Sequence, residues 1–319
     1  MKIAPIRTVS GIPDAGYRPE DDLRHRPSAG GKTRDSLFWE VMLPEQEIGF
    51  QAYLYLTSEG NAGFNVIVWG REKEPLVLDL SDGKVDDDMD FDAFEFQSLK
   101  LIQPADRRTA TLSYSSKKIC LHYDFAGIHD AFSYKQNPDG LPDWFAVNRL
   151  EQSGWVTGFL EFGSRRIELD SVGHRDHSWG MRKWGAPHHW KWLVAYTPDA
   201  SRIVNAWIWL AKGEWGVGGY VVRDGELIPI SHVKQRATYD DDMSQRSIKV
   251  DITDIRGDSC LLEMERFGIV KLPTGGRLAT MIMETACFAT IDGIAAAGQF
   301  ETQWPQNYLD RVVESNKGA

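Results

Sequence analysis

Short runs of β-branched and aromatic residues dominate the chain from residue 37 onward. The runs cover residues 50–56, 64–70, 118–125, 165–170, 204–210 and 218–230. Glycine-containing turn signals accompany them at 61–63, 81–83, 139–140 and 224–225. No segment keeps a 3.6-residue period over a dozen residues. The pattern therefore predicts a mainly β chain of antiparallel strands, of the kind that builds barrels or sandwiches.

A faint internal repeat suggests how the strands are divided. When the chain is shifted by 154 residues, 52–56 falls on 206–210 and 64–68 falls on 218–222. Few residues are identical, so chance is the alternative, but the shift is almost half of the 319 residues. We expect two similar β-domains, 37–160 and 161–319, behind an irregular, Pro- and Gly-rich N-terminal arm over 1–36.

Alternation along the strands places aromatic residues in pairs. Tyr53 and Tyr55 share one face of their strand, and Trp207 and Trp209 share a face in the other half. We expect these pairs to line a cavity or the seam between the domains, with plain core packing as the alternative.

Charge and composition exclude several classes of protein. The net charge of −10 argues against a nucleic-acid binder. Since there is neither an apolar run of 18 residues nor an apolar N-terminal segment, we expect a cytoplasmic protein without a membrane span. Cys120, Cys260 and Cys287 are widely spaced, which predicts buried thiols rather than disulfides or a metal-binding pair. The pattern leaves the oligomeric state open.

Candidate chemistry is concentrated between residues 173 and 192. This segment holds four of the eight histidines, and seven of the 12 tryptophans lie between 179 and 215. Glycines at 173, 180 and 185 argue for a strand end and a loop rather than a helix. In an extended strand, His174 and Asp176 would face one way, and Arg175 and His177 the other.

Three interpretations of this segment compete. A metal could be bound by His174, Asp176 and His177, or by His188 and His189, but neither spacing matches a known ligand pattern, so we expect no metal. Arg175, Asp176 and Arg182 could instead form a buried salt-bridge network that clamps the domains. Acid–base chemistry is the third and favoured interpretation, because burial beside imidazoles, indoles and charges shifts a carboxyl pKa.

Signatures of the common cofactor-dependent and nucleophilic enzymes are missing. The sequence holds no GxGxxG followed by an acidic residue, no GxxxxGK[ST] and no GxSxG. We therefore expect no nicotinamide, no nucleoside triphosphate and no other cofactor.

The segment GHRDHSWGMRKW (173–184), together with EQSGWVTGFLEFG (151–163), resembles the lipocalin-like superfamily of carotenoid 1,2-hydratase (hydroxyneurosporene synthase) and AttH-like proteins. It is most similar to a bacterial branch with a GHRDHSWG motif. The resemblance implies two packed calycin-type β-barrels with a mostly apolar pocket at or near their junction. The hydratases carry Asp-His-Asn-Trp-Gly where this chain has Asp-His-Ser-Trp-Gly at 176–180, which separates it from their substrate class.

Residues and resemblance together favour a cofactor-independent lyase or hydratase acting on a hydrophobic, unsaturated or aromatic small molecule. Asp176 would be the general acid or base, and His174 or His177 would relay protons. Arg175 or Arg182 would hold an anionic group. The pocket wall would be formed by Trp179, Trp184, Trp192, Trp207, Trp209, Tyr53 and Tyr55. The alternatives are a non-enzymatic carrier of lipophilic ligands and a pericyclase-like isomerase.

Overall fold

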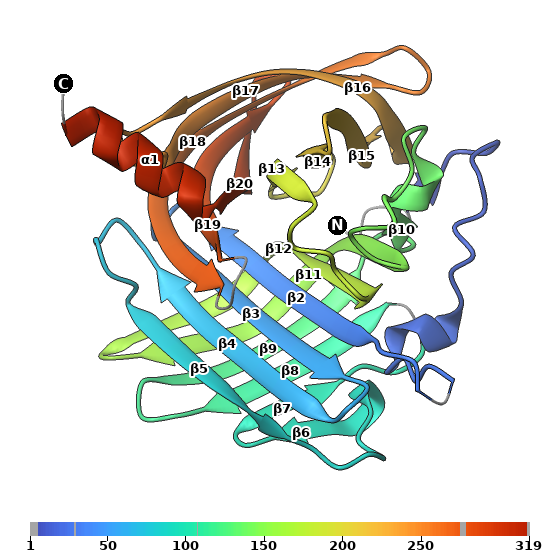
Figure 1. The fold of residues 1–319 in the computed structure, drawn as a ribbon, viewed down its shortest axis with the longest axis vertical. Helices are drawn as coiled ribbons and strands as arrows, with labels where there is room; N and C mark the ends of the chain where they lie inside the picture. Colours follow the sequence, from blue (N-terminus) through green and yellow to red (C-terminus); the bar gives the residue numbers. More distant parts are fainter. Residues whose placement is uncertain (1–5, 29, 107, 275–278, 318–319) are drawn as a thin grey trace.

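The computed structural model describes residues 6–28, 30–106, 108–274 and 279–317. Within them the chain forms two antiparallel sheets that pack against each other (Figure 1). The first sheet has the order β5-β4-β3-β2-β12-β11-β9-β8-β7-β6, with β10 paired to β11, and it curls into a half-barrel. Its strands are β2 (Arg34–Leu43), β3 (Ile48–Thr57), β4 (Asn61–Trp69), β5 (Val77–Lys84), β6 (Phe94–Phe96), β7 (Leu99–Ile102), β8 (Thr109–Ser115), β9 (Ile119–Gly127), β10 (Phe132–Ser133), β11 (Asn148–Phe162) and β12 (Arg165–Gly180).

The second sheet closes on itself, because β16 pairs with β17 as well as with β15. This eight-stranded barrel consists of β13 (Pro187–Tyr196), β14 (Ile203–Ala211), β15 (Glu214–Arg223), β16 (Glu226–Tyr239), β17 (Gln245–Asp254), β18 (Ser259–Thr274), β19 (Thr280–Ile291) and β20 (Ile294–Pro305). Helix α1 (Gln306–Lys317) follows β20 (Figure 1). The prediction of a mainly β, lipocalin-like fold is confirmed, but of the two predicted barrels only the second is closed, and the first is a half-barrel.

Three clusters of buried side chains hold the fold together. One fills the curl of the first sheet and one fills the closed barrel. The third lies between the two sheets, where Phe38, Met42 and Trp69 of the first sheet meet Trp192 and Trp207 of the barrel. Burying these large aromatic side chains joins the two sheets through an apolar seam.

The N-terminal arm spans both sheets. Strand β1 (Arg7–Thr8) pairs in parallel with β16 of the barrel. The 3₁₀ turn η1 (Pro19–Asp22) and the residues after it lie on the first sheet, where the Arg24 guanidinium donates to the carbonyls of Asp87 and Met89. Two further 3₁₀ turns occur, η2 (Phe91–Ala93) and η3 (Tyr134–Gln136). In the part of the chain that the structure describes, no helix is long and apolar enough to cross a membrane.

The change of sheet does not fall at the predicted boundary near residue 160. Strands β11 and β12 form a continuous hairpin from Asn148–Trp179 to Phe162–Arg165, and β12 also pairs with β2. The whole GHRDHSWG segment therefore belongs to the first sheet, and the second sheet begins only at β13. The repeated strands nevertheless occupy equivalent places, because β5-β4-β3-β2-β12 and β16-β15-β14-β13-β20 have the same order.

Two of the four turn signals lie inside strands. Gly63 is in β4 and Gly83 is in β5, where a Cβ atom would stand 2.4 Å from the ring of Tyr55 and 3.1 Å from that of Phe96. These glycines make room for aromatic rings rather than turning the chain. The pattern also missed α1, which is a single short helix anchored by Leu309.

Asp224–Gly225 is a hairpin turn as predicted. Both residues have positive φ, at 52° and 76°, between the paired residues Arg223 and Glu226, which is the geometry of a type I′ turn. Gly219 in β15 also has positive φ, at 127°, but it is crowded, since a Cβ there would lie 2.0 Å from the carbonyl oxygen of Asn205.

We expect Gly219→Ala to destabilise the protein far more than Gly225→Ala. Backbone strain alone costs about 1–2 kcal/mol at Gly225, whose surroundings are open. At Gly219 a clash with backbone adds to the strain, for a total of about 3 kcal/mol or more. Urea unfolding of both variants measures the two losses, and equal losses would contradict this account of β15.

Candidate functional site

A cavity of about 470 Å³ lies at the seam between the two sheets. The first sheet contributes Phe38 from β2 and Tyr53 from β3, and the barrel contributes Trp190, Trp192 and Trp207 from β13 and β14. Because side chains alternate along a strand, Trp190 and Trp192 enter the same face of β13. A cavity of this size with an aromatic lining suits a small hydrophobic ligand.

Asp176 reaches the cavity wall from β12 and belongs to a buried chain of charged groups. The guanidinium of Arg149 donates to the Asp176 carboxylate over 2.8 Å and also bonds Glu151. The second oxygen of Glu151 lies 2.7 Å from Nε2 of His174, whose Nδ1 is 2.9 Å from the hydroxyl of Ser153. One arginine thus joins an acid on the cavity wall to an acid and an imidazole behind it.

Burial and neighbouring acids tune the carboxyl group of Asp176. Desolvation raises the pKa of Asp176 to about 7, since the charges of Glu151 and Glu301 add to the effect of burial and outweigh the attraction of Arg149. For Glu151, burial also acts upward, but the charge of Arg149 and the hydrogen bond from His174 bring its pKa below the ordinary value. At neutral pH Glu151 is ionised, and Asp176 is poised between its two forms.

His174 is held neutral in this arrangement. Complete burial lowers the pKa of His174 below its ordinary value, although Glu151 pulls it the other way. We assign the proton to Nε2, which donates to Glu151, so that Nδ1 accepts from Ser153. His174 therefore positions Glu151 and, through it, Arg149.

A second pair of acids lines the cavity from the barrel side. Glu284 of β19 and Glu301 of β20 are cross-strand neighbours. Burial raises the pKa of Glu284 well above the ordinary value, and the adjacent carboxylate of Glu301 raises it further. Gln299 donates to Glu284 over 2.7 Å, and the indole N–H of Trp190 donates to Glu301. Burial and the neighbouring carboxylate thus both favour the protonated form of Glu284.

Arg182 brings a positive charge to the same cavity. Its guanidinium lies 4.1 Å over the ring of Phe145, and burial lowers the pKa of Arg182 to about 10, with a contribution from the charge of Arg149. Among the described residues no carboxylate pairs with it within 4.0 Å. Arg182 can therefore take an anionic or polar group of a ligand.

The structure brings together half of the predicted site residues. Six of them line the cavity: Asp176, Arg182, Trp184, Trp192, Trp207 and Tyr53. Tyr55 and Trp209 stand beside it, with Tyr55 under the guanidinium of Arg34 and Trp209 packed against Trp144. His174 shares the face of Asp176 but is enclosed behind Glu151.

Arg175, His177 and Trp179 do not belong to the cavity. They project from the opposite face of β12, because odd and even positions alternate in the extended strand. Arg175 contacts Asp22, His177 contacts Asp35, and Trp179 stacks on a histidine of the arm. Of the predicted alternatives, the structure therefore places His174 rather than His177 on the face of Asp176, and Arg182 rather than Arg175 at the cavity.

Four polar residues of the site lie outside the GHRDHSWG motif that the sequence analysis singled out. Glu151 begins the segment 151–163 that carried part of the family resemblance, and Arg149 lies two residues before it; both stand in β11, opposite β12. Glu284 and Glu301 are the single acids of β19 and β20, and a lone acid within a predicted buried strand is the signal that could have indicated them.

The chain belongs to the family described as a domain of unknown function (DUF7064), whose model matches residues 18–306. No curated protein matches the sequence. Among solved structures, an AttH-like protein from Nitrosomonas europaea has a TM-score of 0.63 and 13% identity, over 93% of this chain and 98% of that one. Kievitone hydratase from Nectria haematococca has a TM-score of 0.56 and 9% identity, over 93% and 94% of the two chains. CghA with Sch210972 has a TM-score of 0.57 and 12% identity over 95% of each. These similarities extend over almost the whole chain and show a shared fold.

Glu151→Gln tests the role of the buried charges. The amide keeps the shape of the side chain but leaves Arg149 with one carboxylate, and breaking a buried pair costs about 3 kcal/mol or more in unfolding free energy. Glu161→Gln on the same strand is the matched control, because Glu161 pairs with Arg166 at the exposed surface and its loss costs less than about 1 kcal/mol. Urea unfolding compares the two, and similar losses would show that the network does not stabilise the fold.

Proposed function

We propose that this protein is a cofactor-independent hydratase or dehydratase, a carbon–oxygen lyase that acts on a hydrophobic unsaturated or aromatic small molecule in the cavity between the two sheets. The observation that carries the proposal is the pair of carboxyl groups, Asp176 and Glu284, which face one aromatic cavity with raised pKa values. Sites of proton transfer collect such groups. The fold shared with kievitone hydratase supports the same class of reaction.

The two carboxyl groups suit the two proton transfers of a hydration, one as proton donor and the other as proton acceptor. Glu284, in its protonated form, donates its proton to one carbon of the substrate's double bond, and the positive charge develops on the other carbon. The ionised form of Asp176 accepts a proton from water as the water oxygen bonds to that carbon. One C=C π bond and one O–H bond are broken, one C–H and one C–O bond form, and the proton gained by Asp176 returns to Glu284 through solvent. Dehydration follows the same steps in reverse.

The aromatic wall and Arg149 support this chemistry. The π faces of Trp190, Trp192 and Trp207 attract a developing carbocation, at about 0.5–2 kcal/mol per ring in a dry site. Arg149 holds the Asp176 carboxylate in one orientation, which keeps it aimed at the position of the reacting water. Arg182 lies where it can hold a phenolate or carboxylate of the substrate.

Incubation in H₂¹⁸O with a panel of phenolic and isoprenoid alkenes, beginning with kievitone, tests the reaction. We expect at least one product that has gained one molecule of labelled water, detected by mass spectrometry. Quenching of the tryptophan fluorescence reports binding in parallel. Binding across the panel without any labelled product would contradict the enzyme and favour a carrier.

Asp176→Asn should lower kcat by about 10²-fold or more, because the amide cannot accept the proton of the attacking water. Ligand affinity should change little, since Asn keeps the shape of the side chain. The melting temperature should fall, because Arg149 keeps only one carboxylate partner, so kcat is compared at a temperature where the variant is folded. Asp170→Asn, an exposed acid on the same strand, is the control and should keep full activity. An active Asp176→Asn variant would disprove the acid–base assignment.

The hydration rate should depend on pH in a specific direction. The active form of Asp176 is the carboxylate, so kcat should rise with pH through about 7, where this group loses its proton. At higher pH the rate should fall as Glu284 ionises, since the pKa of that group lies well above its ordinary value. A rate profile in buffers of constant ionic strength measures both limbs. A midpoint near pH 4, typical of an exposed aspartate, would contradict the role of burial.

A further inference from the structure

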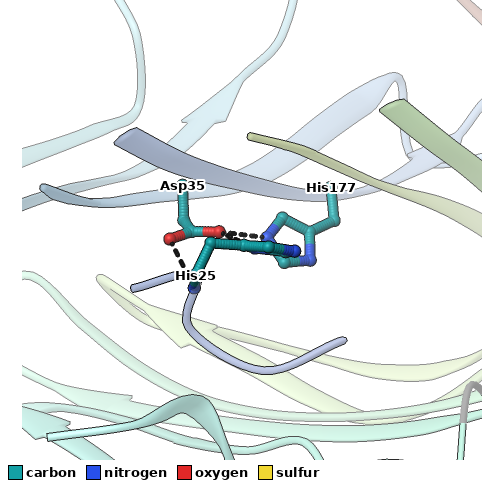
Figure 2. A group of neighbouring side chains, drawn as sticks. All are labelled: His25, Asp35 and His177. Atoms are coloured by element: carbon teal, nitrogen blue, oxygen red, sulfur yellow. Dashed lines mark hydrogen bonds and ion pairs between the residues drawn. The ribbon is translucent and has the colours of Figure 1, made fainter. Parts of the chain in front are cut away.

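A second polar cluster lies on the face of β12 opposite to the cavity. It consists of His177 from β12, Asp35 from β2 and His25 from the N-terminal arm, and Figure 2 shows the three side chains converging. The Nδ1 atom of His25 is 2.6 Å from Oδ1 of Asp35, and Nε2 of His177 is 3.0 Å from the same oxygen. The cavity chemistry described above uses none of the three.

We propose that His25, Asp35 and His177 bind a zinc ion that fastens the N-terminal arm to the first sheet. One ligand atom from each residue lies within 4.8 Å of the other two. Two imidazoles and one carboxylate are a donor set that suits zinc, and they leave a position for water. The proposal does not depend on the reaction assigned to the cavity.

The two separations from Asp35 need only a small adjustment to suit a zinc ion. Bonds of about 2.0–2.2 Å from zinc to nitrogen and oxygen place tetrahedral ligand atoms about 3.3 Å apart. The separations of 2.6 and 3.0 Å widen to this value if the ligands move by a few tenths of an ångström. His25 can make this movement because it stands on the arm, and its side chain is 20% exposed, whereas Asp35 and His177 are almost completely buried.

Residues next to the three ligands hold them in place, as hydrogen-bonded neighbours of ligands do in known metal sites. Oδ1 of Asp21 lies 3.3 Å from Nε2 of His25, so an N–H···carboxylate bond there leaves Nδ1 for the metal. The backbone N–H of His25 donates to the second oxygen of Asp35 over 3.1 Å. Trp179 stacks on the His25 ring at 4.1 Å, which gives the site an apolar wall.

His177 faces the cluster with its Nε2 atom, which lies 3.0 Å from Oδ1 of Asp35. Its other ring nitrogen, Nδ1, is buried and has no hydrogen-bond partner among the residues that the structure describes. Nε2 is therefore the nitrogen through which His177 would bind the ion.

Zinc affinity of the full-length protein tests the proposal directly. After treatment with EDTA and removal of the chelator, zinc is titrated against a chromogenic chelator. We expect one ion per chain with a Kd of about 10 µM or tighter. Cobalt(II) should bind at the same place and give the visible absorption of a four- or five-coordinate ion. Weaker binding, or no saturable binding, overturns the proposal.

Variants locate the ion. His25→Ala and His177→Ala should each weaken zinc binding at least tenfold. His122→Ala is the matched control, because His122 makes a similar 2.9 Å contact with Asp124 but forms no three-ligand group among the described residues. This variant should bind zinc as the wild type does. Since His177 is buried, its variant can fail to fold, so the partly exposed His25 carries the test. Wild-type affinity in folded His25→Ala overturns the proposal.

Proteolysis measures the effect on the arm. Trypsin can cleave after Arg24 only when the arm leaves the first sheet, because the Arg24 side chain is buried there and His25 follows it. Zinc should slow this cleavage at least threefold in the wild type and leave the rate unchanged in His25→Ala. A rate that zinc does not change in the wild type would show that the ion does not fasten the arm, and would overturn that part of the proposal.

Discussion

The central strand β12 imposes the constraint on which both polar clusters of this protein depend. Its two edges pair with β2 and β11, the barrel covers one of its faces and the N-terminal arm covers the other, so each residue must find its partners on one side or the other. Alternation sends His174 and Asp176 toward the seam between the sheets, and Arg175 and His177 toward the arm. Buried charges without partners are costly, so each face holds its own set of counter-charges.

Arg149 supplies the positive charge that balances the buried acids Glu151 and Asp176 at the seam between the sheets. It stabilises the ionised form of Glu151 and binds Asp176, yet burial and the acids of the barrel leave Asp176 with a pKa of about 7. The two sheets thus contribute differently. The first supplies an acid held by an arginine, and the barrel supplies Glu284, an acid whose protonated form burial favours, and most of the aromatic wall. A chemistry that needs a proton donor and a proton acceptor in a dry cavity requires both sheets.

The far face of β12 shows how a sequence motif can serve two purposes. The GHRDHSWG segment supplies one cavity acid, Asp176, and one histidine, His177, that meets the arm. Residues adjacent in the sequence are therefore separated by the thickness of the sheet.

The strand pattern by itself determined the fold class, because alternation and turn residues are local properties. The half-length repeat was matched by strands in equivalent places of the two sheets. The sequence also indicated Asp176 and the aromatic residues Tyr53, Trp192 and Trp207, which lie close in the chain to recognisable patterns. Only the tertiary structure decided that Glu284 and Glu301 complete the cavity and that His25 meets His177. These contacts join residues more than a hundred positions apart, and no local pattern encodes which sheet faces pack together.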